Sequence, residues 1–364
     1  MNDFKAEPPE LRAASQLAVG RVLESGWYVL GNELTIFERL WAETCGTNQG
    51  VGVGNGMDAI EISLRCLGIG PGDEVITTSM TAFATVLAIL RAGATPVLAD
   101  IEPDTAMLSL DSVKRCISRS TKALVLVHLY GQVRDMDAWC KFCTDSGIAL
   151  VEDCAQSHLA SWRGRVAGSF GRVGAYSFYP TKNLGAIGDG GMIVTSDIEI
   201  ASRARCLRNY GQTTRYHHAE LGLNSRLDEL QAAVLGVRLR WLPSFTKRRQ
   251  KFAEAYRFGI SNPLVVQMAA PQESNAHVYH LYVVLCKQRD ALKAHLEKCG
   301  IQSLIHYPIP VHRQEPCWSI SRDTKGLAAC EAHAENCLSL PCHPQLTDVD
   351  VAKVIEAVNA FRSV

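Results

Sequence analysis

Short apolar segments alternate with longer amphipathic ones through the first two thirds of this sequence, and this alternation limits the possible folds more than any other feature. The run Ala-Leu-Val-Leu-Val at residues 123–127 is apolar at every position, as in a strand buried on both faces. The same reasoning predicts strands at 75–77, 96–99 and 148–151, and helices at 81–91 and 135–145. The alternation therefore predicts an α/β fold in which helices cover a mostly parallel sheet. Such sheets bind ligands beyond the carboxyl ends of their strands.

The last third of the chain predicts a second, smaller unit. From Arg226 to Trp241, apolar residues recur at spacings of three and four, which predicts one continuous core-facing helix closed by Pro243. Beyond it we expect a strand at residues 280–285 and a helix at residues 290–298. The predicted division is a large domain, residues 1–245, and a small C-terminal α+β domain, residues 246–364.

The composition excludes several functional classes. The 364 residues include 37 basic and 37 acidic side chains without a concentrated basic run, so we expect neither a nucleic-acid partner nor a membrane surface. No stretch of about eighteen residues is apolar throughout, and the first fifteen residues are charged where a signal peptide is apolar, so we expect a cytoplasmic protein. Thirteen scattered cysteines predict reduced core thiols, and the isolated pair Cys140 and Cys143 in a helical stretch does not predict a metal or redox site.

Two carboxylates, Glu152 and Asp153, directly follow the expected strand at residues 148–151. A carboxylate at the end of a buried strand is costly unless a cation or hydrogen-bond donors meet it, because desolvation disfavours the ion. We therefore expect partners for this pair. Exposed loop acids are the alternative interpretation.

Lys182 lies between aromatic residues and a glycine cluster in the segment YSFYPTKNLGAIGDGG. An exposed surface lysine is the ordinary interpretation of any single lysine. Glycines, however, let the backbone approach a ligand closely, and four of them follow here: Gly185, Gly188, Gly190 and Gly191. An enclosed lysine has a lowered pKa and can become an amine nucleophile that forms a Schiff base with a carbonyl.

A glycine-rich segment, Gly52 to Gly56, opens a helix that continues through Leu67. The N–H groups and the dipole at a helix amino terminus favour an anion such as phosphate. A dinucleotide-binding fingerprint is the alternative, but Met57 stands where that motif needs its third glycine. A single phosphate therefore fits better.

The anion site, the carboxylate and the enclosed lysine together meet the needs of pyridoxal 5′-phosphate. The helix start would bind the phosphate, the carboxylate would keep the pyridinium nitrogen protonated, and the lysine would hold the cofactor covalently. Two rival hypotheses are a non-catalytic protein that only binds the cofactor and a Rossmann-type dehydrogenase or epimerase. All three cofactor features are present, which disfavours the first, and the incomplete glycine fingerprint disfavours the second.

Ten segments spread over nearly the whole chain form a recognisable set. They are SGWYVLGNELTIFE from Ser25, VGVGNGMDAI from Val51, RAGATPVLADIEPDT from Arg91, VHLYGQVRDM from Val127, VEDCAQSH from Val151, YSFYPTKNLGAIGDGG from Tyr176, LRNYG from Leu207, GLNSRLDELQAAVL from Gly222, HVYHLYVV from His277 and HYPIPVHRQ from His306. Together they resemble the DegT/DnrJ/EryC1/StrS family of pyridoxal-phosphate-dependent sugar aminotransferases. The resemblance implies the type I aminotransferase fold and a homodimer with two active sites at the subunit interface.

The resemblance also implies roles for individual residues. Lys182 would be the covalent lysine and would carry the proton between substrate and cofactor, and Asp153 would pair with the pyridinium nitrogen. Gln156 would lie near the 3-hydroxyl of the ring. The expected phosphate contacts are Ser177, the N–H groups of Gly56 and Met57, and Asn224 of the partner subunit.

Two positions depart from the family pattern. Met57 replaces the serine or threonine that is common there, so only its backbone N–H is left to contact phosphate. Ala82 stands where many members place an aromatic residue that stacks on the cofactor, and Phe83 follows one position later.

The resemblance implies transamination in two half-reactions, with L-glutamate as amino donor and a nucleotide-linked keto-sugar as acceptor. Members that catalyse dehydration instead have histidine at the position of Lys182. The segments NSRLDELQAA and HYPIPVHRQ are more similar to members acting at C3, which implies a dTDP-linked 3-oxo-6-deoxyhexose; C4 amination of a 4-keto sugar is the alternative. The candidate substrate residues are Tyr28, His306, Tyr307 and His312, with a packing role as the alternative for each histidine.

Overall fold

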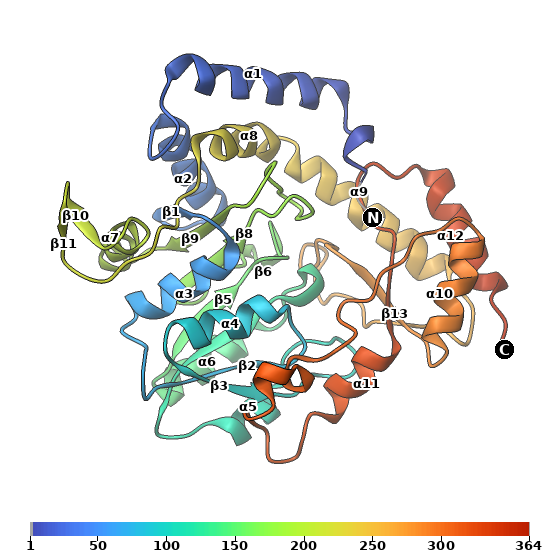
Figure 1. Cartoon of the computed structure of the whole chain (residues 1–364). Helices are drawn as coiled ribbons and strands as arrows, with labels where there is room; N and C mark the ends of the chain where they lie inside the picture. Colours follow the sequence, from blue (N-terminus) through green and yellow to red (C-terminus); the bar gives the residue numbers. More distant parts are fainter. Residues whose placement is uncertain (1–2, 364) are drawn as a thin grey trace.

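The computed structural model describes residues 3–363 and has an eight-stranded sheet at its centre (Figure 1). In spatial order the strands are β1 (Gln49–Val53), β9 (Gly191–Thr195), β8 (Val173–Ser177), β5 (Ala149–Asp153), β4 (Thr121–Val127), β2 (Glu74–Thr78), β3 (Thr95–Ala99) and β14 (Ser321–Arg322). Strand β9 runs antiparallel to both of its neighbours, and every other pairing in this sheet is parallel. The predicted α/β class with a mostly parallel sheet is therefore confirmed.

Helices cover both faces of this sheet, and strand β4 shows how the two faces are divided. Leu124 and Leu126 pack in one apolar cluster with α2 (Asn32–Cys45), α5 (Leu110–Cys116) and α6 (Met136–Ser146). Ala123 and Val125 point the other way, into a cluster with α3 (Gly56–Cys66), α4 (Phe83–Arg91) and α7 (Ile198–Leu207). Successive side chains of a strand point to opposite faces, so an all-apolar strand is what a doubly covered sheet requires.

The expected continuous helix from Arg226 to Trp241 is wrong. The structure has α8 (Glu229–Leu239) followed by a separate helix, α9 (Leu242–Gly259), which contains Pro243 in its first turn. A proline can start a helix because the first-turn N–H groups have no intrahelical acceptor, so Pro243 opens α9 instead of closing α8. Residues before Glu229 are extended, since Asp228 pairs with Val29.

The amino-terminal helix α1 (Pro9–Ser25) lies on the outside of the molecule along α8 (Figure 1). An ion pair of 2.9 Å between Glu7 and Arg238 joins the segment before α1 to α8. Gly26 ends α1 with a φ of 64°, a left-handed conformation that glycine adopts without steric cost. Within residues 3–363, no helix has both the length and the apolar composition needed to cross a membrane.

The carboxyl-terminal part has its own antiparallel sheet of β12 (Val266–Gln267), β13 (Tyr282–Leu285) and β15 (Cys337–Leu340). Helices α9, α10 (Arg289–Lys298) and α12 (Asp348–Ala360) contribute to one apolar core with β13 and β15. Helix α11 (Ala328–Asn336) completes the α-helices of the described residues. Two short antiparallel pairs lie outside the larger sheets: β6 (Ser161–Trp162) with β7 (Arg165–Val166), and β10 (Gln212–Thr214) with β11 (His217–His218). Short 3-10 turns lie at Phe4–Ala6, Leu129–Gly131, Val311–Arg313 and Glu315–Cys317.

Two details of this part differ from the sequence prediction. The strand expected from residue 280 begins at Tyr282, because the N–H of Leu281 bonds instead to the carbonyl of Tyr130 in the large sheet domain. The proposed division at residue 245 falls within α9, whose later turns pack in the carboxyl-terminal core, and it stays a prediction.

An aromatic cluster lies beneath the end of β8. The rings of Phe37 and Phe178 meet edge to face at 5.3 Å, and those of Trp41 and Tyr176 at 5.0 Å. All four side chains are almost completely buried. The cluster fixes the backbone that leads from β8 into the segment carrying Lys182.

We expect Phe37→Ala to lower the free energy of unfolding by about 3–5 kcal/mol, because truncation leaves a cavity against Phe178. Urea unfolding followed by circular dichroism measures the change. Ile198→Ala is the control, since this side chain at the start of α7 is 61% exposed and its loss should cost roughly 0.5 kcal/mol or less. Equal effects of the two substitutions would contradict the described packing.

Candidate active site

The candidate site is formed where neighbouring elements end. Asp153 and Ser177 are the last residues of the parallel, hydrogen-bonded strands β5 and β8. Helix α3 begins at Gly56, directly against Ser177: a Cβ atom added to Gly56 would lie 2.6 Å from the Cβ of Ser177. Glycine is therefore required for this close approach, and the structure brings together three of the predicted site residues.

The amino terminus of α3 offers free backbone donors. The side chain of Asn55 caps the helix by accepting a hydrogen bond of 2.8 Å from the N–H of Asp58. In residues 3–363, the N–H groups of Gly56 and Met57 have no hydrogen-bond acceptor, as is usual for a first helical turn. The Met57 side chain packs against the apolar cluster beneath α3, so only its N–H group remains for an anion.

Asp153 is buried, with 5% of its surface exposed, and hydrogen-bond donors rather than a cation meet it. The hydroxyl of Thr85 donates to Oδ2 at 2.8 Å, and the N–H of Ala155 donates to Oδ1 at 3.1 Å. The predicted need for partners is confirmed, and the alternative of an exposed loop acid is wrong.

Glu152 is fully buried and points to the opposite face of β5. Its carboxylate accepts hydrogen bonds of 2.8 Å from the N–H groups of Gly168, Phe170 and Gly171 and one of 2.9 Å from Nε2 of His128. These four donors saturate the carboxylate. Glu152 therefore anchors the turn before β8 and leaves Asp153 as the available acid.

Lys182 lies in the loop between β8 and β9. Two backbone hydrogen bonds of 2.8 Å shape this loop, from the N–H of Lys182 to the carbonyl of Tyr179 and from the N–H of Ala186 to the carbonyl of Phe178. Burial lowers the pKa of the Lys182 amine to about 8, and the nearby Asp153 carboxylate partly opposes that shift. The lowered pKa enlarges the unprotonated fraction of the amine near neutral pH, and the unprotonated form is the nucleophile.

Three histidines surround Lys182, and burial and the lysine itself lower the pKa of each. The pKa is lowered to about 3 for His158, to about 4 for His306 and well below the usual value for His280. All three are neutral at pH 7, so none adds positive charge beside the lysine. His158 and His280 lie within the family-like segments but carry no predicted role.

The orientation of His280 is fixed by its neighbours. Asn183 donates from Nδ2 to the carbonyl of Val278 at 3.0 Å, so its Oδ1 faces His280. Nδ1 of His280 must then donate to that oxygen, at 3.2 Å. Nε2 is consequently an unprotonated acceptor in the neutral ring.

A ring of hydrogen bonds joins Gln156 to the carboxyl-terminal segment. Gln156 accepts from the N–H of Tyr130 at 2.6 Å and donates from Nε2 to the Tyr307 hydroxyl at 3.3 Å. The Tyr130 hydroxyl donates to the carbonyl of His306 at 2.5 Å and is 2.9 Å from Nε2 of His333. The structure therefore brings Gln156, His306 and Tyr307 into one hydrogen-bonded group. Tyr130, which the sequence analysis did not predict as a site residue, joins them.

The other predicted residues are Tyr28, Asn224 and His312. Tyr28 and Asn224 have exposed side chains. His312 is buried between the Ser79 hydroxyl, 2.6 Å from Nδ1, and the Glu331 carboxylate, 2.9 Å from Nε2. Both ring nitrogens of His312 are engaged, an arrangement that supports its packing role.

Phe83, one residue after the position expected to hold a stacking aromatic, starts α4 and packs against the apolar cluster around Met80 and Val86. Ala82 before it is the residue at the amino-terminal boundary of α4.

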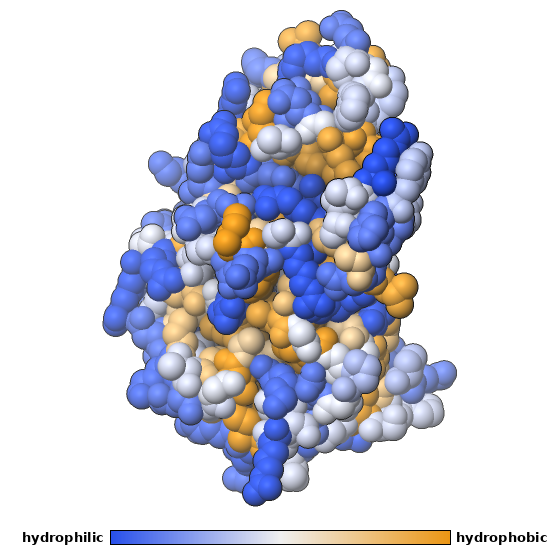
Figure 2. Space-filling view, turned by 90° about the vertical axis from the view of Figure 1, so that its left-hand side faces the viewer, coloured by the Kyte–Doolittle hydropathy of each residue, from blue (hydrophilic) through white to orange (hydrophobic). Residues whose placement is uncertain are grey.

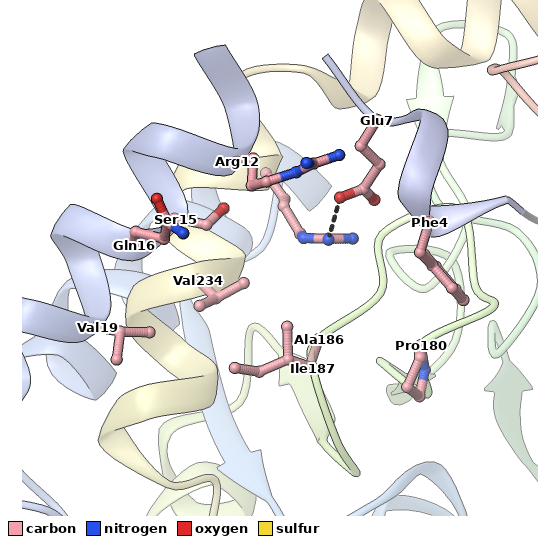
Figure 3. Close-up of a pocket in the computed structure, with 11 residues that line it drawn as sticks. Phe4, Glu7, Arg12, Ser15, Gln16, Val19, Pro180, Ala186, Ile187 and Val234 are labelled. Carbon is pink, nitrogen blue, oxygen red and sulfur yellow. Dashed lines mark hydrogen bonds and ion pairs between the residues drawn. The ribbon is translucent and has the colours of Figure 1, made fainter. Parts of the chain in front are cut away.

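Two cavities flank the loop of Lys182. One of about 240 Å³ is bordered by Thr181, His280 and His306. The other, of about 540 Å³, lies between α1, α8 and the loop, and Figure 3 shows Val19, Val234 and Ile187 from these three elements around it. The loop therefore lies between a smaller cavity near the histidines and a larger one beneath α1.

Comparison with known proteins agrees with this geometry. The family model for the DegT/DnrJ/EryC1/StrS aminotransferase family matches residues 9–359. The chain belongs to this family. The family resemblance of the sequence is thus confirmed over almost its full length.

Several relatives of known name can be aligned over nearly the whole chain. A dTDP-3-amino-3,4,6-trideoxy-alpha-D-glucose transaminase of Streptomyces venezuelae is 45% identical, over 99% of this chain and 95% of the relative. A dTDP-3-amino-3,6-dideoxy-alpha-D-galactopyranose transaminase of Aneurinibacillus thermoaerophilus is 44% identical, over 95% and 94%. A pleiotropic regulatory protein of Geobacillus stearothermophilus is 39% identical, over 99% and 98%.

Solved structures also match over nearly the whole of this chain. The crystal structure of S. venezuelae DesV in complex with a ketimine intermediate has a TM-score of 0.95 at 45% identity, covering 98% of this chain and 96% of DesV. NtdA from Bacillus subtilis with bound cofactor PMP has a TM-score of 0.89 at 26% identity, covering 97% and 82%. The fold is thus that of the family's aminotransferases.

We expect Lys182 to react with an aldehyde at lower pH than an ordinary lysine, whose pKa is near 10.4. Incubation with pyridoxal 5′-phosphate across pH 6 to 9, borohydride reduction and peptide mapping would measure the labelled fraction. Labelling at residue 182 should rise through about pH 8, because only the unprotonated amine attacks a carbonyl. A label distributed over exposed lysines, unchanged by Lys182→Arg, would contradict the assignment.

Proposed function

We propose that this protein is a pyridoxal-phosphate-dependent transaminase. It transfers the amino group of L-glutamate to C3 of a nucleotide-linked 3-keto-6-deoxyhexose, with dTDP as the nucleotide. One observation is the main support for transamination chemistry. The Lys182 amine, whose pKa is lowered, lies near the Asp153 carboxylate at the end of a buried strand. The names of the two relatives at 44–45% identity, both dTDP-3-amino-sugar transaminases, support the C3 position and the nucleotide.

The residues present fit the cofactor. Asp153 would accept a hydrogen bond from the ring nitrogen, and Gln156, which has a second amide hydrogen, would donate to the 3-hydroxyl. The free N–H groups of Gly56 and Met57 and the Ser177 hydroxyl would bind the phosphate. When bound, the cofactor supplies an electron sink for the carbon that loses its proton.

Lys182 performs the proton transfer. Its amine nitrogen can accept a proton from the substrate carbon and return it, because burial places its pKa near the working pH. Neutral His158, His280 and His306 add no competing positive charge around it. Asp153, held by two donors, would provide the negative charge for the ring nitrogen of a bound cofactor.

His306 and Tyr307 are the candidate sugar contacts. Both are partly buried and belong to the hydrogen-bonded ring with Gln156 and Tyr130, which supports a place for them beside the cofactor that Gln156 would contact. The Tyr307 hydroxyl has its pKa raised to about 12 by burial and by Asp153, so it stays protonated and can donate to a sugar or cofactor oxygen.

The proposed active form is a homodimer. Asn224 is exposed in the single chain and would reach the phosphate of the partner's site. Large apolar side chains are exposed near α1 and beside Lys182: Leu17, Trp27, Tyr28, Ile36, Tyr179 and Ile187. Figure 2 shows several apolar patches on the face that carries the β10–β11 pair and the α1–α2 turn. A second copy would bury such surface and cover the 540 Å³ cavity beneath α1.

We expect the purified protein with its cofactor to be yellow, to lose this colour with L-glutamate while 2-oxoglutarate is released, and to regain it with a dTDP-3-keto-6-deoxyhexose. Absorbance spectroscopy and product analysis measure both half-reactions. Lys182→Ala should abolish them, whereas Lys141→Ala, on the exposed surface of α6, should not. Equal turnover of a 4-keto sugar would reject the C3 assignment, and no half-reaction with any amino acid would favour a regulatory protein.

We expect two inactive variants to restore activity in mixed dimers. Lys182→Ala removes the nucleophile, and Asn224→Asp places negative charge against the phosphate. If each site combines Lys182 of one chain with Asn224 of the partner subunit, a mixed dimer contains one intact site. Co-expression with two different affinity tags isolates mixed dimers for assay. Activity no higher than that of either variant alone would show that the site is not shared.

A further inference from the structure

Thr85 connects the first turn of α4 to the candidate active site. Its side chain is 1% exposed, and its hydroxyl lies 2.8 Å from Oδ2 of Asp153. A carboxylate oxygen can only accept, so Thr85 is the donor. The hydroxyl of Thr81, also buried, is 2.8 Å from the same Thr85 oxygen and must donate to it, because the Thr85 hydrogen is already used.

These two hydroxyls do not serve the helix on which they lie. Threonine near a helix start usually accepts a hydrogen bond from a free backbone N–H. Here the N-cap residue of α4 is Ala82, which provides no side-chain cap. In the described part of the chain, the Thr81 and Thr85 hydroxyls bond each other and Asp153 instead of the α4 backbone.

We propose that Thr85, supported by Thr81, is a positioning residue that orients the Asp153 carboxylate for the ring nitrogen of the cofactor. This inference rests on the proposed function, in which Asp153 faces that nitrogen. In this role Thr85 acts through Asp153 and not directly on the substrate or the cofactor.

The chemistry of a buried carboxylate supports this role. Without donors, a charged group at the end of β5 would be strongly disfavoured by desolvation. Oδ1 receives the N–H of Ala155 and Oδ2 the hydroxyl of Thr85, so each oxygen is fixed and keeps a further lone pair for an incoming N–H. Donation from Thr81 polarises the Thr85 hydroxyl and strengthens its bond to the anion.

The test compares two probes of the purified full-length protein. One is pyridoxal 5′-phosphate, and the other is its 1-deaza analogue, which has carbon in place of the ring nitrogen. Thr85→Val keeps the side-chain shape but removes the hydroxyl, and Thr85→Ser keeps the hydroxyl. We expect Thr85→Val to weaken binding of pyridoxal 5′-phosphate about tenfold and to slow the L-glutamate half-reaction by a similar factor. Binding of the 1-deaza analogue should be unchanged, and Thr85→Ser should restore both quantities.

Further variants separate positioning from folding. Thr81→Val should act in the same direction as Thr85→Val but less strongly, because it removes only the outer hydroxyl. Thr246→Val in α9 is the matched control, since Thr246 is buried and its hydroxyl has no hydrogen-bond partner among residues 3–363. Circular dichroism and thermal unfolding show whether each variant is folded.

The outcomes are distinct. If Thr85→Val weakens both probes equally, or neither, the positioning role is wrong while the proposed function stands. If Thr85→Val does not fold, the inference depends on Thr81→Val, and equal effects of that variant on both probes overturn it. If the wild-type protein binds neither probe, the proposed function itself fails.

Discussion

The buried carboxylate of Asp153 at the carboxyl end of β5 is the constraint on which the rest of the site depends. A sheet covered by helices on both faces excludes water from its strand ends, so an acid there must receive hydrogen bonds from the protein. The N–H of Ala155 and the hydroxyl of Thr85 meet this need without adding a positive charge. The carboxylate keeps its negative charge available for a ligand, and that charge also moderates the lowered pKa of Lys182.

The other titratable groups around Lys182 likewise add little net charge to the site. One buried histidine, His158, and two partly buried ones, His280 and His306, are neutral. Glu152, the other acid of the strand end, is saturated by backbone N–H groups and His128 on the opposite side of β5. The three histidines therefore add no positive charge to that of the Lys182 amine, and Asp153 is the acid of this strand end that remains available. The Tyr130 hydroxyl ties the segment of His306 to this centre, so the carboxyl-terminal part of the chain contributes directly to the site.

The apolar pattern of the sequence was sufficient to predict the central sheet, because strands buried on both faces are apolar at nearly every position and can be recognised locally. Periodicity failed between Arg226 and Trp241, where apolar spacing alone could not show that Pro243 starts α9. Asp153 and Lys182 were found because each lies in a short segment with a clear local signal. Thr85 and Tyr130 were missed, since their partners are 68 and 26 residues away and nothing local marks them.

The sequence by itself determined the α/β class, the membership in an aminotransferase family and the residue types available for cofactor chemistry, because these depend on local patterns and short motifs. Only the tertiary structure decided which donors hold Asp153, which tautomer His280 adopts, and that His312 is enclosed between Ser79 and Glu331. Hydrogen bonds and desolvation act between groups that the chain brings together from distant positions, so the pKa of a group and its partners follow from packing rather than from spacing along the chain.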